Sequence, residues 1–288
     1  MSTSGRGDAP IACFSHVQKA GGTTVEAVMR RHFGVRHMLV NPPRGWIYRK
    51  KDLAADLRLN PWARSIGGHW LRPFVDFGEF EDRLAWYIFL REPVSRFLSH
   101  YQYHVEHMGV TAPFEQWMEQ PIQHNWQTQF LAGEQDVEAA KQILASRYRA
   151  IGLLERFDES LLLVRQALGL NGLDPWYGRP HNPAQSGEKR RSIAERYREQ
   201  CVERNQLDLE LYRFARDELY PRQVAEYGEE RLRKEVASEF AGRDGEHGTP
   251  VRSSRELGYL LFRRAVHLPV GRVRSGIAKM RGVPDERR

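Results

Sequence analysis

Residues 11–29 read IACFSHVQKAGGTTVEAVM, and this stretch decides the fold. The apolar residues 11–14 predict a short buried strand, and the small residues after Lys19 predict a turn. The following helix, opened by Thr23 and Thr24, has apolar residues at helical spacing: Val25, Val28 and Met29. The segment thus predicts a strand, a glycine loop and a helix in that order.

A second unit of this kind follows the strongest predicted strand, residues 84–90. Pro93 stands in the first turn of its helix, where the missing N–H costs little. Further strands are predicted at 65–69, ending in a glycine turn, and at 150–154. Strands that alternate with helices predict an α/β fold: a P-loop-like, doubly wound, mainly parallel sheet flanked by helices. Ligands of such sheets bind beyond the carboxyl ends of the strands.

Other segments are predicted from their composition. Residues 41–62 and 171–191 are rich in turn-forming residues and predict loops. Asp158 is predicted to cap a helix, and charged helices are predicted from about 192 to 219. Cys13 and Cys201 lack the close spacing of metal or disulfide motifs, so both are predicted to be reduced thiols.

The chain has 288 residues, of which 41% are hydrophobic, enough for one domain with a substantial core. We expect a disordered N-terminus over residues 1–10 and one catalytic domain over residues 11–241. A linker and a basic C-terminal tail are expected over residues 242–288.

The net charge of +7 lies in the tail. Residues 252–288 carry ten Arg and Lys against three Asp and Glu, whereas residues 1–251 are balanced. The body has no basic stripe with interleaved aromatic residues, which argues against a nucleic-acid partner. The sequence has no apolar run of signal or membrane-spanning length, so we expect a cytoplasmic protein.

The loop at residues 16–24 has the features of an anion site. Small residues that lead into a helix expose backbone N–H groups at the positive end of the helix dipole. Lys19 adds a mobile charge, and the hydroxyls of Thr23 and Thr24 add donors. In the Walker A motif the lysine directly precedes Ser or Thr, whereas Lys19 precedes the glycines. This order disfavours a nucleotide triphosphatase.

Arg91 at the tip of the 84–90 strand and Ser99, eight positions further on, form a second candidate element. Taken alone, Arg91 is better explained by a surface salt bridge and Ser99 by a solvated helix position. Next to a phosphate loop, a guanidinium fork and a hydroxyl at a strand end are suited to hold a terminal phosphate.

Together, QKAGGTT (18–24) and LREPVSRFLS (90–99) resemble the 5'-phosphosulfate and 3'-phosphate motifs of carbohydrate sulfotransferases, most closely the heparan sulfate 6-O-sulfotransferases. Ala20 replaces the usual Thr and Glu92 the usual Asp, and the N-terminal anchor of the animal Golgi enzymes is missing. Weaker similarities extend the resemblance over roughly residues 11–223: NWQTQFLA (125–132), GLLERF (152–157) and NQLDLELY (205–212).

The resemblance implies a sulfotransferase that moves a sulfuryl group from 3'-phosphoadenosine 5'-phosphosulfate (PAPS) to a hydroxyl of a carbohydrate or glycoconjugate. Lys19 is then also catalytic, because it stabilises the leaving group. We expect no metal, since a monoanionic sulfuryl group needs no magnesium bridge and the chain has no dedicated metal-binding motif. The implied cofactor-binding residues are Lys19, Ala20, Gly21, Gly22, Thr23, Thr24, Arg91 and Ser99.

Sulfuryl transfer also needs a base for the acceptor hydroxyl. The segment GGHW (67–70) resembles the Gly/His segment that carries the base in related sulfotransferases, so His69 is the candidate. An imidazole with a pKa near ~6.5 is largely neutral at cytoplasmic pH and can accept a proton. His16 and His104 are its rivals. Trp70 and Trp126 are candidates to stack on a sugar ring, although burial is the commoner role of tryptophan.

Two other classes of function stay open. The main alternative is a P-loop-like ATP-dependent kinase of a small hydroxylated substrate. A non-catalytic polysaccharide- or membrane-binding module would depend on the tail alone. The acceptor itself is not determined by the sequence.

The tail combines leucines at helix-like intervals with arginines. We expect it to contact an anionic membrane at the inner membrane surface. It also fits a polyanionic acceptor or a terminal helix packed on the body. Pro269 and several glycines are expected to interrupt any long helix. The leucines are Leu257, Leu260, Leu261 and Leu268.

Overall fold

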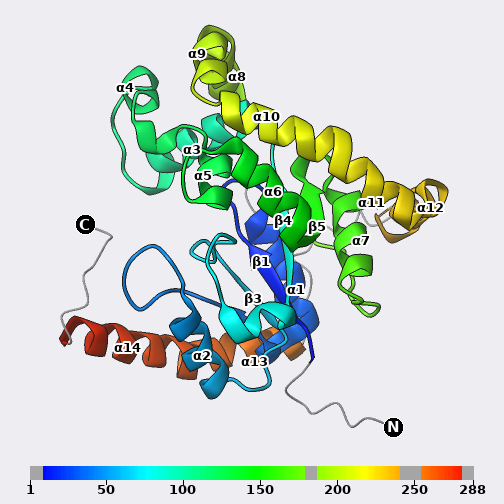
Figure 1. Cartoon of the computed structure of the whole chain (residues 1–288). Coiled ribbons are helices and arrows are strands. Elements are labelled where there is room, and N and C mark those ends of the chain that lie inside the picture. Colours follow the sequence, from blue (N-terminus) through cyan, green and yellow to red (C-terminus); the bar gives the residue numbers. More distant parts are fainter. Residues whose placement is uncertain (1–8, 179–186, 241–253, 281–288) are drawn as a thin grey trace.

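The computed structural model describes residues 9–178, 187–240 and 254–280. Five parallel strands form one sheet in the order β2-β3-β1-β4-β5, flanked by helices (Figure 1). The predicted fold class is therefore confirmed. The strands are Ile11–Ser15 (β1), His37–Leu39 (β2), Ser65–Gly68 (β3), Leu84–Leu90 (β4) and Tyr148–Leu153 (β5).

The α-helices and the longest 3₁₀ helix of the described chain have the following bounds. They are α1 (Gly22–Phe33), α2 (Lys50–Leu59), η2 (Gly78–Arg83), α3 (Pro93–His107), α4 (Phe114–Met118), α5 (Trp126–Ala132), α6 (Val137–Arg147), α7 (Phe157–Ala167), α8 (Gly187–Arg196), α9 (Arg198–Glu203), α10 (Gln206–Phe214), α11 (Tyr220–Tyr227), α12 (Glu229–Phe240), α13 (Ser254–Phe262) and α14 (Leu268–Met280).

The main hydrophobic core surrounds the sheet, and β4 is buried along its whole length between β1 and β5. Strands buried on both faces read as continuous apolar runs, which explains why β4 was predicted to the residue. A smaller core under α3, α4 and α9 contains Phe97, Trp117 and Cys201. Cys13 and Cys201 are both free and buried, as predicted.

Three local predictions are wrong. The loop predicted over 41–62 contains α2, because its proline and glycine signals flank the helix while the Asp52 carboxylate accepts from the Arg49 N–H at 3.0 Å. In the loop predicted over 171–191, α8 already begins at Gly187. Asp158 does not cap α7, which begins one residue earlier; its carboxylate accepts from the Tyr177 hydroxyl at 2.7 Å instead.

The expected interruption of the tail at Pro269 is also wrong. A π-helical turn, Arg263–His267, joins α13 to α14, and Pro269 lies in the first turn of α14. Pro221 follows the π-turn Ala215–Leu219 in the same way. A proline ring clashes with the carbonyl four residues earlier, and a widened π-turn relieves that clash. The predicted disordered N-terminus and the linker lie almost entirely outside the described residues.

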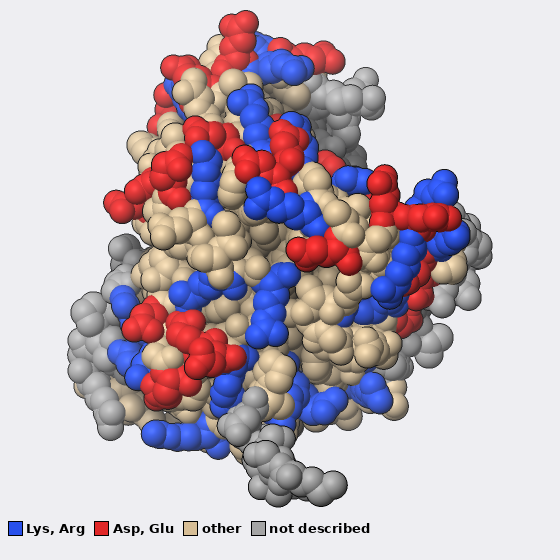
Figure 2. Space-filling model, turned by 45° about the vertical axis from the view of Figure 1, so that its right-hand side comes forward, with Lys and Arg blue, Asp and Glu red and all other residues tan. Residues whose placement is uncertain are grey.

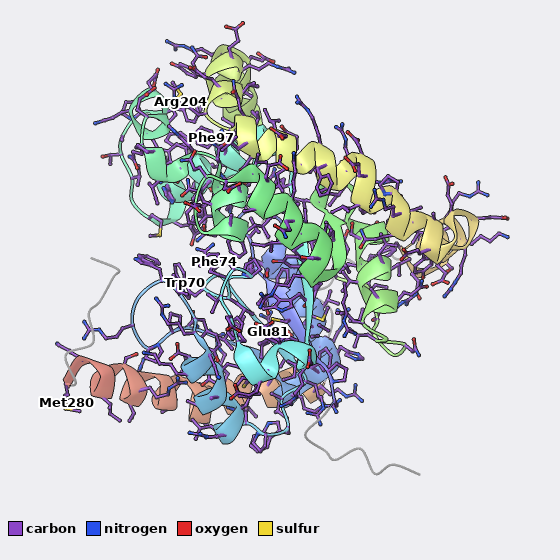
Figure 3. All side chains as sticks on the ribbon, in the orientation of Figure 1. Trp70, Phe74, Glu81, Phe97, Arg204 and Met280 are labelled. Carbon is purple, nitrogen blue, oxygen red and sulfur yellow. The ribbon has the colours of Figure 1, made fainter. Side chains whose placement is uncertain are left out.

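Acidic and basic side chains alternate over much of the visible surface (Figure 2), in keeping with the balanced charge of residues 1–251. Figure 3 places Trp70 and Phe74 between the helices α3–α5 above and α2 below. This is the side on which the strands of the sheet end.

Candidate active site

The sheet order brings three candidate segments to one edge. β1 lies between β3 and β4, and its last residue, Ser15, pairs with Gly68 of β3 and Ile88 of β4. The residues that follow these parallel strands therefore emerge side by side. They are the glycine loop after β1, His69 after β3 and Arg91 after β4.

The loop after β1 needs glycine for two reasons. Gly21 has a left-handed backbone (φ 81°), and a Cβ on Gly22 would lie 1.9 Å from the His16 ring. Lys19 is also left-handed, with φ 68°. α1 starts at Gly22 without a side-chain cap and without an acidic residue in its first turn. Its first N–H groups thus face no anionic side chain of their own helix, which suits an anionic ligand.

A hydrogen bond joins the two motifs that the sequence singled out. Arg91 Nη1 donates to the Lys19 carbonyl oxygen at 3.0 Å. Lys19 Nζ lies 4.5 Å from the centre of the Tyr103 ring on α3. Burial, and secondarily the charge of Arg91, lowers the pKa of Lys19. Ser99 is half-buried about two turns into α3. The structure therefore gathers positive charge where an anion would neutralise it.

The ring of His69 has a defined orientation. Its Nδ1 lies 2.8 Å from the His16 carbonyl oxygen, which can only accept a hydrogen bond, so Nδ1 carries the proton. In the neutral ring the lone pair is then on Nε2. Burial lowers the pKa of His69, which favours this neutral form. The geometry thus gives His69 the tautomer and protonation state of a general base.

The rival histidines differ from His69. The ring of His104 accepts at Nδ1 from the Trp117 Nε1–H (2.9 Å), so its neutral form carries the proton on Nε2. The His16 ring is packed between Gly22 and His69, 3.9 Å from the His69 ring centre, and burial lowers its pKa well below the usual value. Neither rival combines a free acceptor nitrogen with the position of His69 after β3.

A buried carboxylate lies beneath the histidines. Glu26 on α1 has one oxygen 2.7 Å from His37 Nε2 and the other 3.8 Å from His16 Nδ1. A Cβ on Gly67 would lie 2.3 Å from Glu26, so the glycine lets α1 pack closely on β3. This explains in physical terms why the Gly/His segment begins with small residues.

Aromatic residues line the region beyond His69. The rings of Trp70 and Trp46 are 4.4 Å apart, and Trp46 is 42% exposed. The guanidinium of Arg72 lies over the rings of Trp126 (5.4 Å) and Phe130 (4.1 Å). Burial lowers the pKa of Arg72 to about 10, so it is still a cation at neutral pH. No motif in the sequence points to Trp46 or Arg72, because both are brought here only by folding.

The three weaker motifs of the sequence also meet at this edge. Gln127, from the first of them, makes hydrogen bonds to the main chain of Arg91. Glu155, from the second, accepts from the Glu92 N–H at 2.8 Å, and Tyr212, from the third, donates to Glu155 at 2.7 Å. The three motifs are recognisable in the sequence, but the contacts of these side chains come only from the structure.

Two kinds of feature are absent from the described parts of the chain. No group of three or more His, Cys, Asp or Glu residues there could hold a metal ion. No described helix is long and apolar enough to cross a membrane.

Comparison with known proteins identifies the class. The model of the sulfotransferase family matches residues 11–215, which include all five strands and the three segments at the sheet edge. The chain therefore belongs to the sulfotransferase family. No curated protein matches the chain. The similarity to heparan sulfate 6-O-sulfotransferases stays a prediction from the motifs.

Proposed function

We propose that this protein transfers a sulfuryl group from PAPS to a hydroxyl of a carbohydrate or glycoconjugate. The observation that carries the proposal is the hydrogen bond from Arg91 to the Lys19 carbonyl. It joins the glycine loop after β1 to the turn after β4, which supports a single site, and His69 follows the neighbouring strand β3. A donor with a 5'-phosphosulfate and a 3'-phosphate has the two anionic groups that such a site would bind.

The chain would bind the donor mainly through charge and N–H groups. The N–H groups of residues 20–24 and the hydroxyls of Thr23 and Thr24 would hold the 5'-phosphate, while Arg91 and Ser99 would hold the 3'-phosphate. Lys19 would donate to the oxygen that bridges sulfur and phosphorus, where negative charge grows as that bond breaks. Burial lowers the pKa of Lys19, and the negative charge of a bound phosphosulfate would favour its ammonium form.

His69 would activate the acceptor. Its Nε2 takes the hydroxyl proton while the hydroxyl oxygen bonds to sulfur, and the S–O bond to the phosphate breaks with its electron pair on the phosphate. The products are a sulfate ester, 3'-phosphoadenosine 5'-phosphate (PAP) and a protonated His69. The hydrogen bond from Nδ1 to the His16 carbonyl supports this role, since it leaves Nε2 free.

A carbohydrate acceptor is supported by the aromatic residues beyond His69. The paired rings of Trp46 and Trp70 offer flat apolar surfaces to a sugar ring, and the partly exposed ring of Trp46 can be reached from solvent. Arg72 would favour acceptors that carry an acidic group.

The first experiment measures thermal protection of the purified protein by PAP and by ATP. Protection by PAP and not by ATP is expected. Protection by ATP alone would favour the kinase alternative. Incubation with PAPS and a panel of glycans, followed by mass spectrometry, should then reveal a gain of one sulfuryl group on the acceptor.

We also propose that α13 and α14 hold the protein on an anionic membrane surface. Both helices contact the body of the protein. Tyr259 of α13 is buried, and Arg274 of α14 pairs with Asp52 and Asp56 of α2. These contacts fit the terminal-helix alternative for part of the tail. α14 runs past α2 and away from the sheet, to the left in Figure 1.

The outer side of this segment carries apolar and basic residues together. Residues 257–280 contain five Arg and Lys and no Asp or Glu. A second copy docked on this side would bring like charges together, whereas anionic headgroups would neutralise them. This difference favours a membrane over self-association. The large exposed apolar residues are Leu257, Leu261, Leu268, Val273, Ile277 and Met280.

Sedimentation with phosphatidylglycerol vesicles at low salt tests this proposal. Wild type should sediment with them and not with phosphatidylcholine vesicles, while truncation after Gly248 should abolish sedimentation but preserve turnover on a small acceptor. The double change Arg264→Glu and Arg272→Glu should act like the truncation, and the matched reversal of the exposed Arg213 and Arg222 should not. Wild type that ignores anionic vesicles overturns the proposal.

A further inference from the structure

The turn after β4 is braced from outside the site. Gln127, fully buried at the start of α5, accepts from the Arg91 N–H through Oε1 (3.0 Å) and donates from Nε2 to the Arg91 carbonyl (2.9 Å). Both main-chain groups of Arg91 are thus held by one side chain. The Arg91 side chain in turn donates to the Lys19 carbonyl, so the direction of the guanidinium depends on a main chain that Gln127 holds.

The position of Gln127 is fixed by α5 and α10, because the starts of these two helices cap each other. Asp208 on α10 accepts from the N–H groups of Gln127 (3.0 Å) and Thr128 (2.7 Å) at the start of α5. Asn125, just before α5, accepts from the N–H groups of Leu207 (3.0 Å) and Asp208 (3.3 Å) at the start of α10. Each helix start is capped by the other's polar residue, so the two starts cannot shift independently.

A second contact reaches the same turn from the other side. Glu155 accepts the Glu92 N–H and the Tyr212 hydroxyl, while the Glu92 carboxylate caps α3 by accepting from Val94 and Ser95. Beneath the turn, the guanidinium of Arg96 is fully buried, and none of its nitrogens has a hydrogen-bond partner in the described chain. Burial lowers its pKa to about 10, so it adds a positive charge below Arg91.

From this geometry we infer that Gln127 is a positioning residue: it sets the Arg91 guanidinium where it can recognise the 3'-phosphate of the donor, and Glu155 supports the same turn. The inference rests on the proposed function, since it assumes that Arg91 meets that phosphate. Gln127 and Glu155 act only through the main chain of residues 91 and 92. Their contribution should therefore appear as nucleotide selectivity and not as a change in the chemical step.

Calorimetry with PAP and AMP tests the inference. In Gln127→Met, a side chain of similar length that lacks both hydrogen bonds, the preference for PAP over AMP should fall about tenfold. KM for PAPS should rise while kcat changes little. The matched control is Gln129→Met on the same helix, whose amide donates to the His124 carbonyl and which should keep the wild-type preference.

The Glu155→Ala variant separates the effect of the Glu155 hydrogen bonds from the effect of its negative charge. Because Glu155 is exposed, its replacement carries a small risk of misfolding. Removing a carboxylate near a phosphate would by charge alone strengthen PAP binding, whereas loss of the brace weakens it. A folded Gln127→Met protein with an unchanged PAP preference, or a Glu155→Ala protein that binds PAP more tightly, overturns the inference. Wild type that does not distinguish PAP from AMP would instead contradict the proposed function.

Discussion

The proposed donor and acceptor halves of the site are built differently. In the donor half, hydrogen bonds connect the loop after β1, the turn after β4 and the starts of α5 and α10. In the acceptor half, beyond β3, aromatic rings predominate, and Trp46 is 42% exposed. Hydrogen bonds fix the positions of charged groups, whereas ring faces tolerate several orientations of a ligand.

The difference matches what each half has to bind. A nucleotide donor presents the same phosphates in every reaction, so a rigid array of N–H groups and cations suits it. An acceptor surface made of ring faces can change its specificity by few substitutions. The donor half is therefore where family motifs are informative, and the acceptor half is where they are not.

His69→Ala should have the largest effect, because it removes the proposed general base, which lies between the two halves. We expect kcat to fall roughly 10²- to 10⁴-fold, the usual contribution of a general base, with PAP affinity nearly unchanged. Steady-state kinetics and calorimetry measure the two quantities. Near-normal turnover would move the role of base to His16 or His104.

The pH dependence of the wild type checks the same residue. Burial lowers the pKa of His69, so its neutral form persists below pH ~6.5. Turnover should stay constant as the pH falls to that value and decline only as it passes through the lowered pKa. If turnover instead falls with a midpoint above pH ~6.5, a group other than His69 controls the pH dependence.

Lys19→Ala should have the second-largest effect on turnover, and it tests the role of Lys19 in the donor half. Its contact strengthens as charge grows on the leaving phosphate, so kcat should fall roughly 10²- to 10³-fold while PAP binding weakens much less. The control variant is Lys141→Ala, at a half-buried lysine of α6 that pairs with Glu138 and Glu210 outside the site. Equal losses in turnover and PAP affinity would make Lys19 a plain binding residue.

The sequence predicted the donor half because its chemistry is local. A buried strand, a glycine loop and a helix start are contiguous in residues 11–29, and β4 with Arg91 repeats the pattern. Parallel strands then place the loop and the turn at the same edge. His69 could be proposed for the same reason, although only the structure gives the proton on its Nδ1.

The acceptor half could not be predicted because its residues come from separate segments. Trp46 lies in a connection before α2 that was predicted to be a loop, and Arg72 is followed by no recognisable motif. Gln127 was visible in a weak motif, but its role depends on Asp208, 81 positions away in the sequence. Such pairings follow from helix packing, which a single sequence does not specify.

Arg91→Ala tests the donor half where it would bind the 3'-phosphate. Loss of a charge-assisted contact should cost about 1.5 to 3 kcal/mol of PAP binding, with little loss for AMP, which lacks the 3'-phosphate. Calorimetry with both nucleotides gives the comparison. An equal loss for PAP and AMP would assign Arg91 to the integrity of the loop through Lys19 and not to the 3'-phosphate.

Trp46→Ala should have the smallest effect and bears most directly on the acceptor half. The Trp46 ring is tilted by 60° to the Trp70 ring and would offer one face to a sugar. A contact with an aromatic face contributes about 0.5–1.5 kcal/mol, so KM for the acceptor should rise about two- to tenfold. KM for PAPS and kcat should stay at wild-type values, because the ring lies outside the donor half. Trp62→Ala is the matched control, since that tryptophan is similarly exposed (41%) but packs against Phe262. A raised KM for PAPS in Trp46→Ala would mean that the two halves are mechanically coupled, and the contrast between them would fail.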